Sequence, residues 1–134
     1  MKVLLDTSCL VAFFLNDAHY NKARAVLESI LEGETQGVIS ALSFAELCGA
    51  IRRNAGEGIA KAVKDKVAGL IEKGFIEVVQ LKAQDAYASG DLAISTGLRG
   101  ADAVIVNAAR ENAAKLFTFD EEIRKKGRGY VEFI

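Results

Sequence analysis

Short runs of β-forming residues alternate along this chain with longer stretches of helical periodicity, and no other feature restricts the possible folds as strongly. The expected strands are Val3 to Leu5, Gly37 to Ala41, Phe75 to Leu81, Leu116 to Phe119 and Tyr130 to Ile134. Helix faces are expected at Ala23, Val26, Leu27, Ile30 and Leu31, and at Ile59, Val63, Val67, Leu70 and Ile71. Alternating strands and helices favour a parallel sheet covered on both faces. The sequence therefore predicts an α/β fold, one three-layer domain over residues 1–134 with a five-stranded parallel sheet flanked by helices.

Breaks between helices are expected at glycines, because the chain contains no proline. Asn54 to Gly58 is predicted to separate two helices. Thr96 to Gly100 is predicted to divide the region from Ala83 to Ala114 into two more, the second beginning near Ala101.

Net charge argues against a general attraction to nucleic acid. Lysine and arginine number 17 against 18 acidic residues, a formal charge of -1. Any RNA contact must therefore be local. The best candidate is the basic run from Arg124 to Arg128, joined by Arg52, Arg53, Arg99 and Arg110. For the run alone, a solvated charged face is the preferred interpretation.

The two cysteines, Cys9 and Cys48, lie in apolar stretches without a signal-peptide pattern. We expect both to be free thiols in the core, in a reducing cytoplasm. The longest apolar run, Cys9 to Leu15, is far shorter than the roughly 20 residues that a membrane span requires. A soluble, cytoplasmic protein is expected.

Four acidic residues are predicted to meet at one edge of the sheet. Asp6 follows the first strand, and Asp120 follows the fourth. Glu46 is expected in the first turn of the helix after the second strand, and Asp102 in the first turn of the helix before the fourth. With right-handed crossovers, parallel strands end and the following helices begin at the same edge, where ligands collect.

Each acid has a simpler explanation as a helix cap. Ser43 to Glu46 matches a capping box, and Thr118 to Glu121 resembles another. Asp6 or Asp102 could instead stabilise a helix N-terminus through the helix dipole. Together, however, four converging carboxylates repel one another unless a cation neutralises them. An all-oxygen set without cysteine or histidine favours Mg²⁺ or Mn²⁺.

The only histidine, His19, is expected to be a surface or capping residue, so imidazole is not expected to act as the general base. Metal-activated water then remains as the nucleophile, a pattern used in phosphodiester hydrolysis. Ser8 and Thr118 lie beside the acids, where they would either hold a ligand or water or cap helices.

Four segments, in this order, resemble the PIN-domain family, especially VapC-type toxins of toxin–antitoxin pairs. They are Val3 to Ser8, Ala45 to Leu47, Gly97 to Ala103 and Leu116 to Asp120. The resemblance implies a five-stranded parallel sheet, a divalent-metal endoribonuclease site and homodimers, often with an antitoxin whose tail occupies the catalytic groove. It assigns metal binding to Asp6, Glu46, Asp102 and Asp120, and an auxiliary hydroxyl to Thr118.

Two other enzyme classes fit the sequence less well than an RNA-cleaving toxin. A phosphorylatable receiver domain needs paired acids after its first strand and a lysine after its last, but Asp6 has no acidic neighbour and Tyr130 to Ile134 supplies no lysine. A dehalogenase-like phosphatase needs an aspartate where Ser8 stands. A non-catalytic PIN-fold module that binds RNA or protein, and a free-standing RNA-processing nuclease, remain open alternatives.

Overall fold

The computed structural model describes all residues 1–134 and contains four strands and seven helices. In chain order these are β1 (Lys2–Leu5), α1 (Thr7–Leu15), α2 (Tyr20–Leu31), β2 (Gln36–Ser40), α3 (Ala41–Ala55), α4 (Glu57–Glu72), β3 (Ile76–Val79), α5 (Ala83–Thr96), α6 (Gly100–Glu111), β4 (Lys115–Phe117) and α7 (Glu121–Lys126). The predicted alternation of strands and helices is confirmed.

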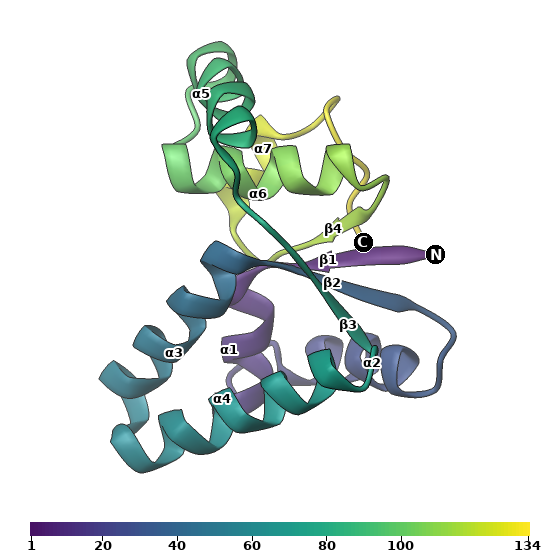
Figure 1. Ribbon diagram of the computed structural model, residues 1–134, viewed down its shortest axis with the longest axis vertical. Helices are drawn as coiled ribbons and strands as arrows, with labels where there is room; N and C mark the ends of the chain where they lie inside the picture. The colour runs from purple at the N-terminus through teal and green to yellow at the C-terminus, as the bar shows by residue number, and fades with distance from the viewer.

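The strands form one parallel sheet in the order β3-β2-β1-β4. In its centre, Leu4 of β1 is paired with Val38 of β2 on one side and with Leu116 of β4 on the other. Helices α1 to α4 cover one face, and α5 to α7 cover the opposite face (Figure 1). The predicted three-layer α/β fold is therefore correct.

The predicted fifth strand, Tyr130 to Ile134, is wrong. This segment lies beside β4 but forms only an isolated bridge, between Phe133 and Leu116. Leu116 donates its N–H to Glu132 and accepts one from Ile134, at 2.8 and 3.1 Å. Because β4 is only 3 residues long before the chain turns into α7, it offers an edge too short for a longer ladder.

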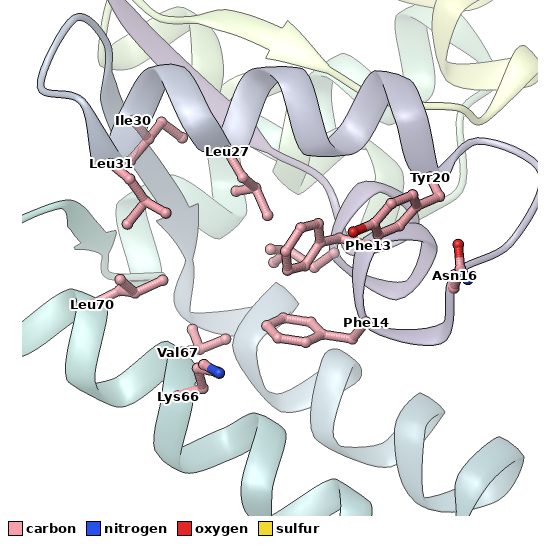
Figure 2. Close-up of a pocket in the computed structure, with 11 residues that line it drawn as sticks. Phe13, Phe14, Asn16, Tyr20, Leu27, Ile30, Leu31, Lys66, Val67 and Leu70 are labelled. Atoms are coloured by element: carbon pink, nitrogen blue, oxygen red, sulfur yellow. The ribbon is translucent and has the colours of Figure 1, made fainter.

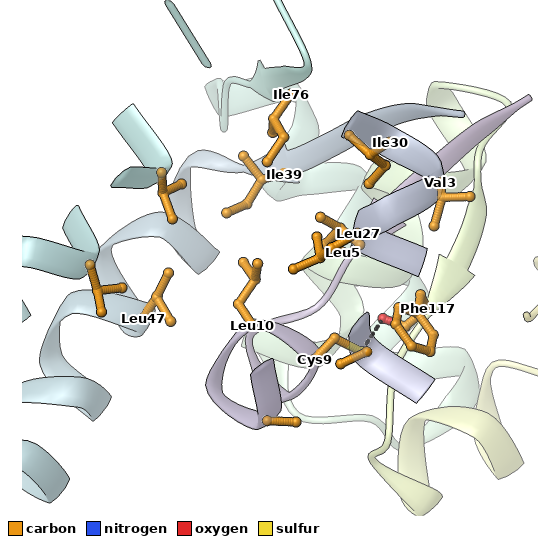
Figure 3. Packing of buried hydrophobic residues seen from close by; sticks show 14 of the residues in the cluster. Val3, Leu5, Cys9, Leu10, Leu27, Ile30, Ile39, Leu47, Ile76 and Phe117 are labelled. Atoms are coloured by element: carbon orange, nitrogen blue, oxygen red, sulfur yellow. Dashed lines mark hydrogen bonds between the residues drawn. The ribbon is translucent and has the colours of Figure 1, made fainter. Parts of the chain in front are cut away.

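Alternation along the strands divides the core into two clusters, one on each face of the sheet. Val3 and Leu5 of β1 belong to the larger cluster, whereas Leu4 between them belongs to the other. The larger cluster fills the space between the sheet and helices α1 to α4 (Figure 3). In it the buried thiol of Cys9 donates a hydrogen bond to the carbonyl of Phe117, at 3.0 Å.

Both predicted helix breaks are confirmed. Gly56, between α3 and α4, has φ +93°, and Gly97, which caps α5, has φ +76°. These left-handed values favour glycine, which has no side chain to strain. Helix α6 begins at Gly100, one residue before the expected start. None of the helices has the length and apolar character needed to cross a membrane.

The expected apolar faces of α2 and α4 are only partly buried. Ala23, Leu27 and Ile30 lie in the core, but Leu31 is 51% exposed. On α4, Val63 and Val67 are buried while Ile59 is 51% exposed.

An apolar groove of about 660 Å³ lies between helices α1, α2 and α4 (Figure 2). We call it the α1/α2/α4 groove, and it is lined by Leu10, Phe13, Phe14, Asn16, Tyr20, Leu27, Ile30, Leu31, Lys66, Val67 and Leu70. On its α1 side, Phe13 stacks on Tyr20 with ring centroids 5.6 Å apart. The groove explains why Leu31 is not covered.

Candidate functional site

The strand order creates a switch point between β1 and β4. From β1 the chain proceeds through β2 to β3 on one side, and then returns to place β4 on the other side of β1. In open α/β sheets the crevice at the carboxyl ends of such strands is the usual ligand site. Asp6 directly follows β1, and Thr118 directly follows β4. The two chain segments that border the switch point therefore carry three of the five predicted site residues, Asp6, Thr118 and Asp120.

Asp6 is the most buried of the four acids, with 7% of its surface exposed. Its Oδ1 accepts the N–H of Thr7 at 2.8 Å and so caps α1. Its Oδ2 accepts the hydroxyl protons of Ser8 at 3.0 Å and Thr118 at 2.6 Å. Asp6 therefore caps α1 through Oδ1 and contacts the neighbouring site residues through Oδ2.

Thr118 joins the two strand ends. Besides donating to Asp6, its buried hydroxyl accepts the N–H of Asp120 at 3.0 Å. Ser8, from the other segment, accepts the N–H of Phe119 at 3.1 Å. The two hydroxyls hold the segment after β4 against the segment after β1, so their orientation is largely set by protein hydrogen bonds.

Asp120 is the N-cap of α7. Its Oδ1 accepts the N–H groups of Glu122 at 2.9 Å and Ile123 at 3.1 Å. The box predicted to begin at Thr118 is therefore wrong, because the cap itself is Asp120. Its Oδ2 receives neither of these bonds and is left for the site.

Asp102 lies in the first turn of α6, as predicted, and makes no capping hydrogen bond. Glu46 departs from its predicted place. Helix α3 begins at Ala41 with Ser40 as the N-cap, so Ser43 to Glu46 is not a capping box and Glu46 lies in the second turn. The hydroxyl of Thr7, which the sequence did not single out, donates to Glu46 Oε1 at 3.5 Å.

Electrostatic coupling shows that the four acids share one environment. The pKa of Glu46 is raised by partial desolvation first, then by the charge of Asp6 and, more weakly, of Asp102. The pKa of Asp102 is raised by partial desolvation first and then by Asp120 and Asp6, against a lowering by Arg99. Asp6, Glu46, Asp102 and Asp120 are therefore close enough to influence one another's ionisation.

The remaining candidate residues have different places. Cys9 is buried, and desolvation followed by the charge of Asp6 raises its pKa far above the usual range, so it stays a neutral thiol. Cys48 is also free but only half-buried, not in the core as expected. Among the basic candidates, Arg99 lowers the pKa of Asp102 through its charge. Lys126 is hydrogen-bonded to the carbonyl of Gly97 and to the carboxylate of Glu122.

His19 is exposed and precedes α2, but its side chain makes no capping hydrogen bond. Its ring stacks instead on Phe119, with centroids 4.2 Å apart and planes 13° from parallel. The surface interpretation of His19 is confirmed and the capping interpretation is wrong. Phe119, between Thr118 and Asp120, was not identified from the sequence as a functional candidate.

The fold and the site together define a class of protein: a parallel α/β domain with acidic side chains at the switch point of its sheet. The model of the PIN domain family matches residues 3–129 of the chain. The chain belongs to the PIN-domain family, as its sequence motifs predicted. No curated protein was found to match it in sequence.

Several solved structures share the fold. VapC20 of Mycobacterium tuberculosis, a toxin that cleaves the sarcin-ricin loop, has a TM-score of 0.76 and 18% identity, covering 97% of this chain and 98% of its own. VapBC2 of Rickettsia felis, bound to promoter DNA, has a TM-score of 0.72 and 18% identity, covering 100% and 98%. A toxin–antitoxin complex from Klebsiella pneumoniae has a TM-score of 0.70 and 18% identity, covering 96% and 94%.

Proposed function

We propose that this chain is a Mg²⁺- or Mn²⁺-dependent endoribonuclease, the toxin of a toxin–antitoxin pair. The observation that carries the proposal is the acidic cluster at the switch point, where partial desolvation first, and then the charges of neighbouring acids, raise the pKa values of Glu46 and Asp102. Membership of the PIN-domain family supports a nuclease, and the similar VapC toxins support a toxin.

The side chains fit a hard divalent cation by their chemistry. All the donors are carboxylate or hydroxyl oxygens, which suit Mg²⁺ and Mn²⁺. As the side chains stand, no three His, Cys, Asp or Glu residues are close enough to hold an ion together. Carboxylates repel one another when no cation is bound, and Mg²⁺ usually keeps several waters beside one or two direct carboxylate ligands. The other acids of the set would then act on the ion through its waters and by their charge.

When bound at Asp6, Glu46, Asp102 and Asp120, the cation would neutralise the cluster and activate water for attack on the phosphorus. The protein groups have separate tasks. Asp6 is held in place by Ser8 and Thr118, so its orientation does not depend on substrate. The hydroxyl proton of Thr118 is committed to Asp6, which makes Thr118 a positioning residue.

Cleavage of a defined RNA, with and without Mg²⁺, tests this function. We expect cleavage that EDTA stops and that Asp6→Asn abolishes. Asp65→Asn, an exposed aspartate on α4, is the matched control and should leave cleavage unchanged. If all three proteins bind RNA but none cleaves it, the chain is a non-catalytic binding module instead.

The product ends test the chemistry. Attack by water leaves a 5′-phosphate on the downstream fragment and a free 3′-hydroxyl on the upstream one. No histidine pair is present to deprotonate the ribose hydroxyl, since His19 is the only histidine. Mass spectrometry should therefore find no 2′,3′-cyclic phosphate. Cyclic ends, together with cleavage that persists in EDTA, would refute the proposed mechanism.

The antitoxin is proposed to place apolar side chains in the α1/α2/α4 groove (Figure 2). The Klebsiella and Rickettsia complexes of the same fold support an antitoxin partner. The groove supports its place on this chain, because 9 of the 11 lining residues are hydrophobic. Large apolar concavities of this kind are typical of protein-binding surfaces.

Co-expression with a short neighbouring reading frame tests the partner. Leu31→Glu should weaken the complex because a charge enters the groove. Ile59→Glu is the matched control, since Ile59 is exposed to the same extent, 51%, and does not line the groove. Equal affinity of both variants would place the antitoxin elsewhere. If no neighbouring frame binds but the chain cleaves RNA, it is a free-standing processing nuclease.

A further inference from the structure

A second concavity, of about 170 Å³, borders the acidic cluster on the α2 side and has no role in the function proposed above. Its lining combines aromatic and basic side chains. The residues are His19, Lys22, Phe117, Thr118, Phe119, Glu121, Arg124 and Ile134. Among them, the cations Lys22 and Arg124 outnumber the single acid, Glu121.

Three aromatic rings in contact with one another form one wall of this concavity. Phe117 and Phe119 are two residues apart on an extended segment and meet edge to face, with centroids 5.1 Å apart. His19 lies nearly parallel over Phe119 at 4.2 Å. His19 is exposed to solvent, and Phe119 is the only aromatic ring stacked on it.

The ring of His19 is not needed to form the start of α2. Histidine is not among the preferred N-cap residues, and the side chain of His19 makes no capping bond. The backbone N–H of His19 is bonded to Asp17 Oδ1 at 2.8 Å, so the loop is shaped without the ring. The imidazole is thus free to present a flat face beside the site.

The stacked rings of His19 and Phe119, which we call the platform, are close to the acids along the chain. Phe119 is flanked by Thr118, which is bonded to Asp6, and by Asp120. Because Phe119 is adjacent in sequence to two site residues, we expect a base stacked on His19 to belong to a nucleotide near the scissile phosphate. Lys22, one turn after His19 on α2, is exposed and makes no ion pair in the structure, which leaves its ammonium available for a phosphate.

We propose that the exposed ring of His19, supported by Phe119, stacks a base of a single-stranded RNA substrate, and that Lys22 binds the adjoining phosphate. The proposal rests on the ribonuclease function above and adds a base-binding subsite to it. Proteins recognise single-stranded RNA in this way, by stacking splayed bases on aromatic and histidine rings and pairing the backbone with cations. Stacking tolerates every base, so the subsite selects an unpaired nucleotide rather than a sequence.

Binding of a short fluorescein-labelled single-stranded RNA, measured in EDTA by anisotropy, tests the platform separately from cleavage. His19→Ala should weaken binding by about 5- to 150-fold, the range that loss of one base stack produces. His19→Phe retains a flat ring and should bind like the wild type. With Mg²⁺, His19→Ala should raise KM and leave kcat unchanged, because His19 does not touch the reacting atoms.

A series of RNAs with one abasic position each locates the stacked base. One position should weaken binding to the wild type but not to His19→Ala, since both changes remove the same stack. Lys22→Gln should lower the salt dependence of binding by about 0.7 in slope, and the exposed Lys64→Gln should not.

The outcomes separate the two proposals. A wild type that cleaves RNA while His19→Ala binds equally well keeps the nuclease and overturns the platform. A wild type that binds RNA through His19 but never cleaves keeps the platform and overturns the nuclease. If the wild type does not bind RNA, or if every abasic position costs both proteins the same affinity, the platform is also overturned.

Discussion

The hydroxyl of Thr118, a residue that is 1% exposed, donates to the carboxylate of Asp6 after β1 and accepts the N–H of Asp120 after β4. Thr118→Val keeps the shape but leaves Asp6 short of a donor and the Asp120 N–H without an acceptor. A buried polar group that loses its partner costs about 1–3 kcal/mol. We expect Thr118→Val to lower the free energy of urea unfolding by that amount and to reduce cleavage.

Thr118→Ser is the control, because it keeps the hydroxyl and removes only a methyl group. We expect it to retain most of the stability and activity. Equal urea midpoints for the valine variant and the wild type would show that the two bonds contribute nothing.

Asp102 is expected to destabilise the metal-free protein at neutral pH. Its folded pKa is raised above the ordinary 3.8, so the folded state binds a proton more readily than the unfolded state. The penalty is absent below the unfolded pKa and complete above the raised folded pKa. Stability without metal should therefore fall as pH rises through this interval.

Asp102→Asn removes that loss. Because Asp102 is partly exposed and solvent screens its charge, we expect only a few tenths, about 0.3 kcal/mol, of added stability at pH 7. Thermal melts in EDTA at pH 3 and pH 7 measure the difference. A helix-dipole role alone predicts the reverse, a loss of about 0.3–1 kcal/mol at pH 7.

At the scale of single residues, the sequence predicted the acids better than their surroundings. Asp6 and Asp120 were recognisable because they directly follow strand-like runs. Glu46 was misplaced because Ser40, rather than Ser43, caps α3. The stack of His19 on Phe119 joins residues 100 positions apart, and no local pattern reports such a contact.

Helix α7 depends on a glycine at its end. A Cβ on Gly127 would lie 2.7 Å from the carbonyl oxygen of Ile123, in the backbone of the same helix end. We expect Gly127→Ala to cost about 1–3 kcal/mol, as overpacking does. It should also reduce cleavage, because α7 has Asp120 as its N-cap.

Gly58→Ala is the matched change in another helix. No heavy atom lies within 4 Å of a Cβ at Gly58, and the position is helical. We expect it to stabilise the protein by about 0.5–1 kcal/mol, since alanine favours helix. Urea unfolding of both variants checks the pair, and equal effects would contradict the steric argument.

At the scale of elements, helices and their breaks were predictable because periodicity and glycine are local signals. The order of the strands was not. No local sequence pattern shows that β4 pairs with β1, yet this pairing brings Thr118 into contact with Asp6. The segment from Tyr130 to Ile134 has the composition of a strand and was therefore predicted as one. It lies beside β4, which is only 3 residues long and offers too short an edge for a ladder.

At the scale of the whole molecule, α5 leaves an apolar face without a partner. Tyr87 and Ile94 are two helical turns apart and 76% and 85% exposed. We predict a homodimer that covers this face. Ile94→Glu should raise the dimer dissociation constant by roughly tenfold or more, because burial of such a side chain contributes about 1.5–3 kcal/mol.

Light scattering at micromolar concentration measures the dimer. Ile59→Glu, a change of the same kind at an exposed position on α4, should leave the dimer intact. A wild type that remains monomeric throughout this range would refute the prediction.

We expect the stability of the whole domain to depend on whether its ion is bound. An ion that binds only the folded state adds RT ln(1 + [L]/Kd), about 2.7 kcal/mol at a hundred times Kd. At constant ionic strength, Mn²⁺ or Mg²⁺ should therefore raise the Tm of the wild type by several degrees. Asp6→Asn should remove most of this response and Asp65→Asn none of it, because only Asp6 is at the switch point. A wild-type Tm that neither ion changes would count against a metal site formed by these acids, whatever the RNA assays find.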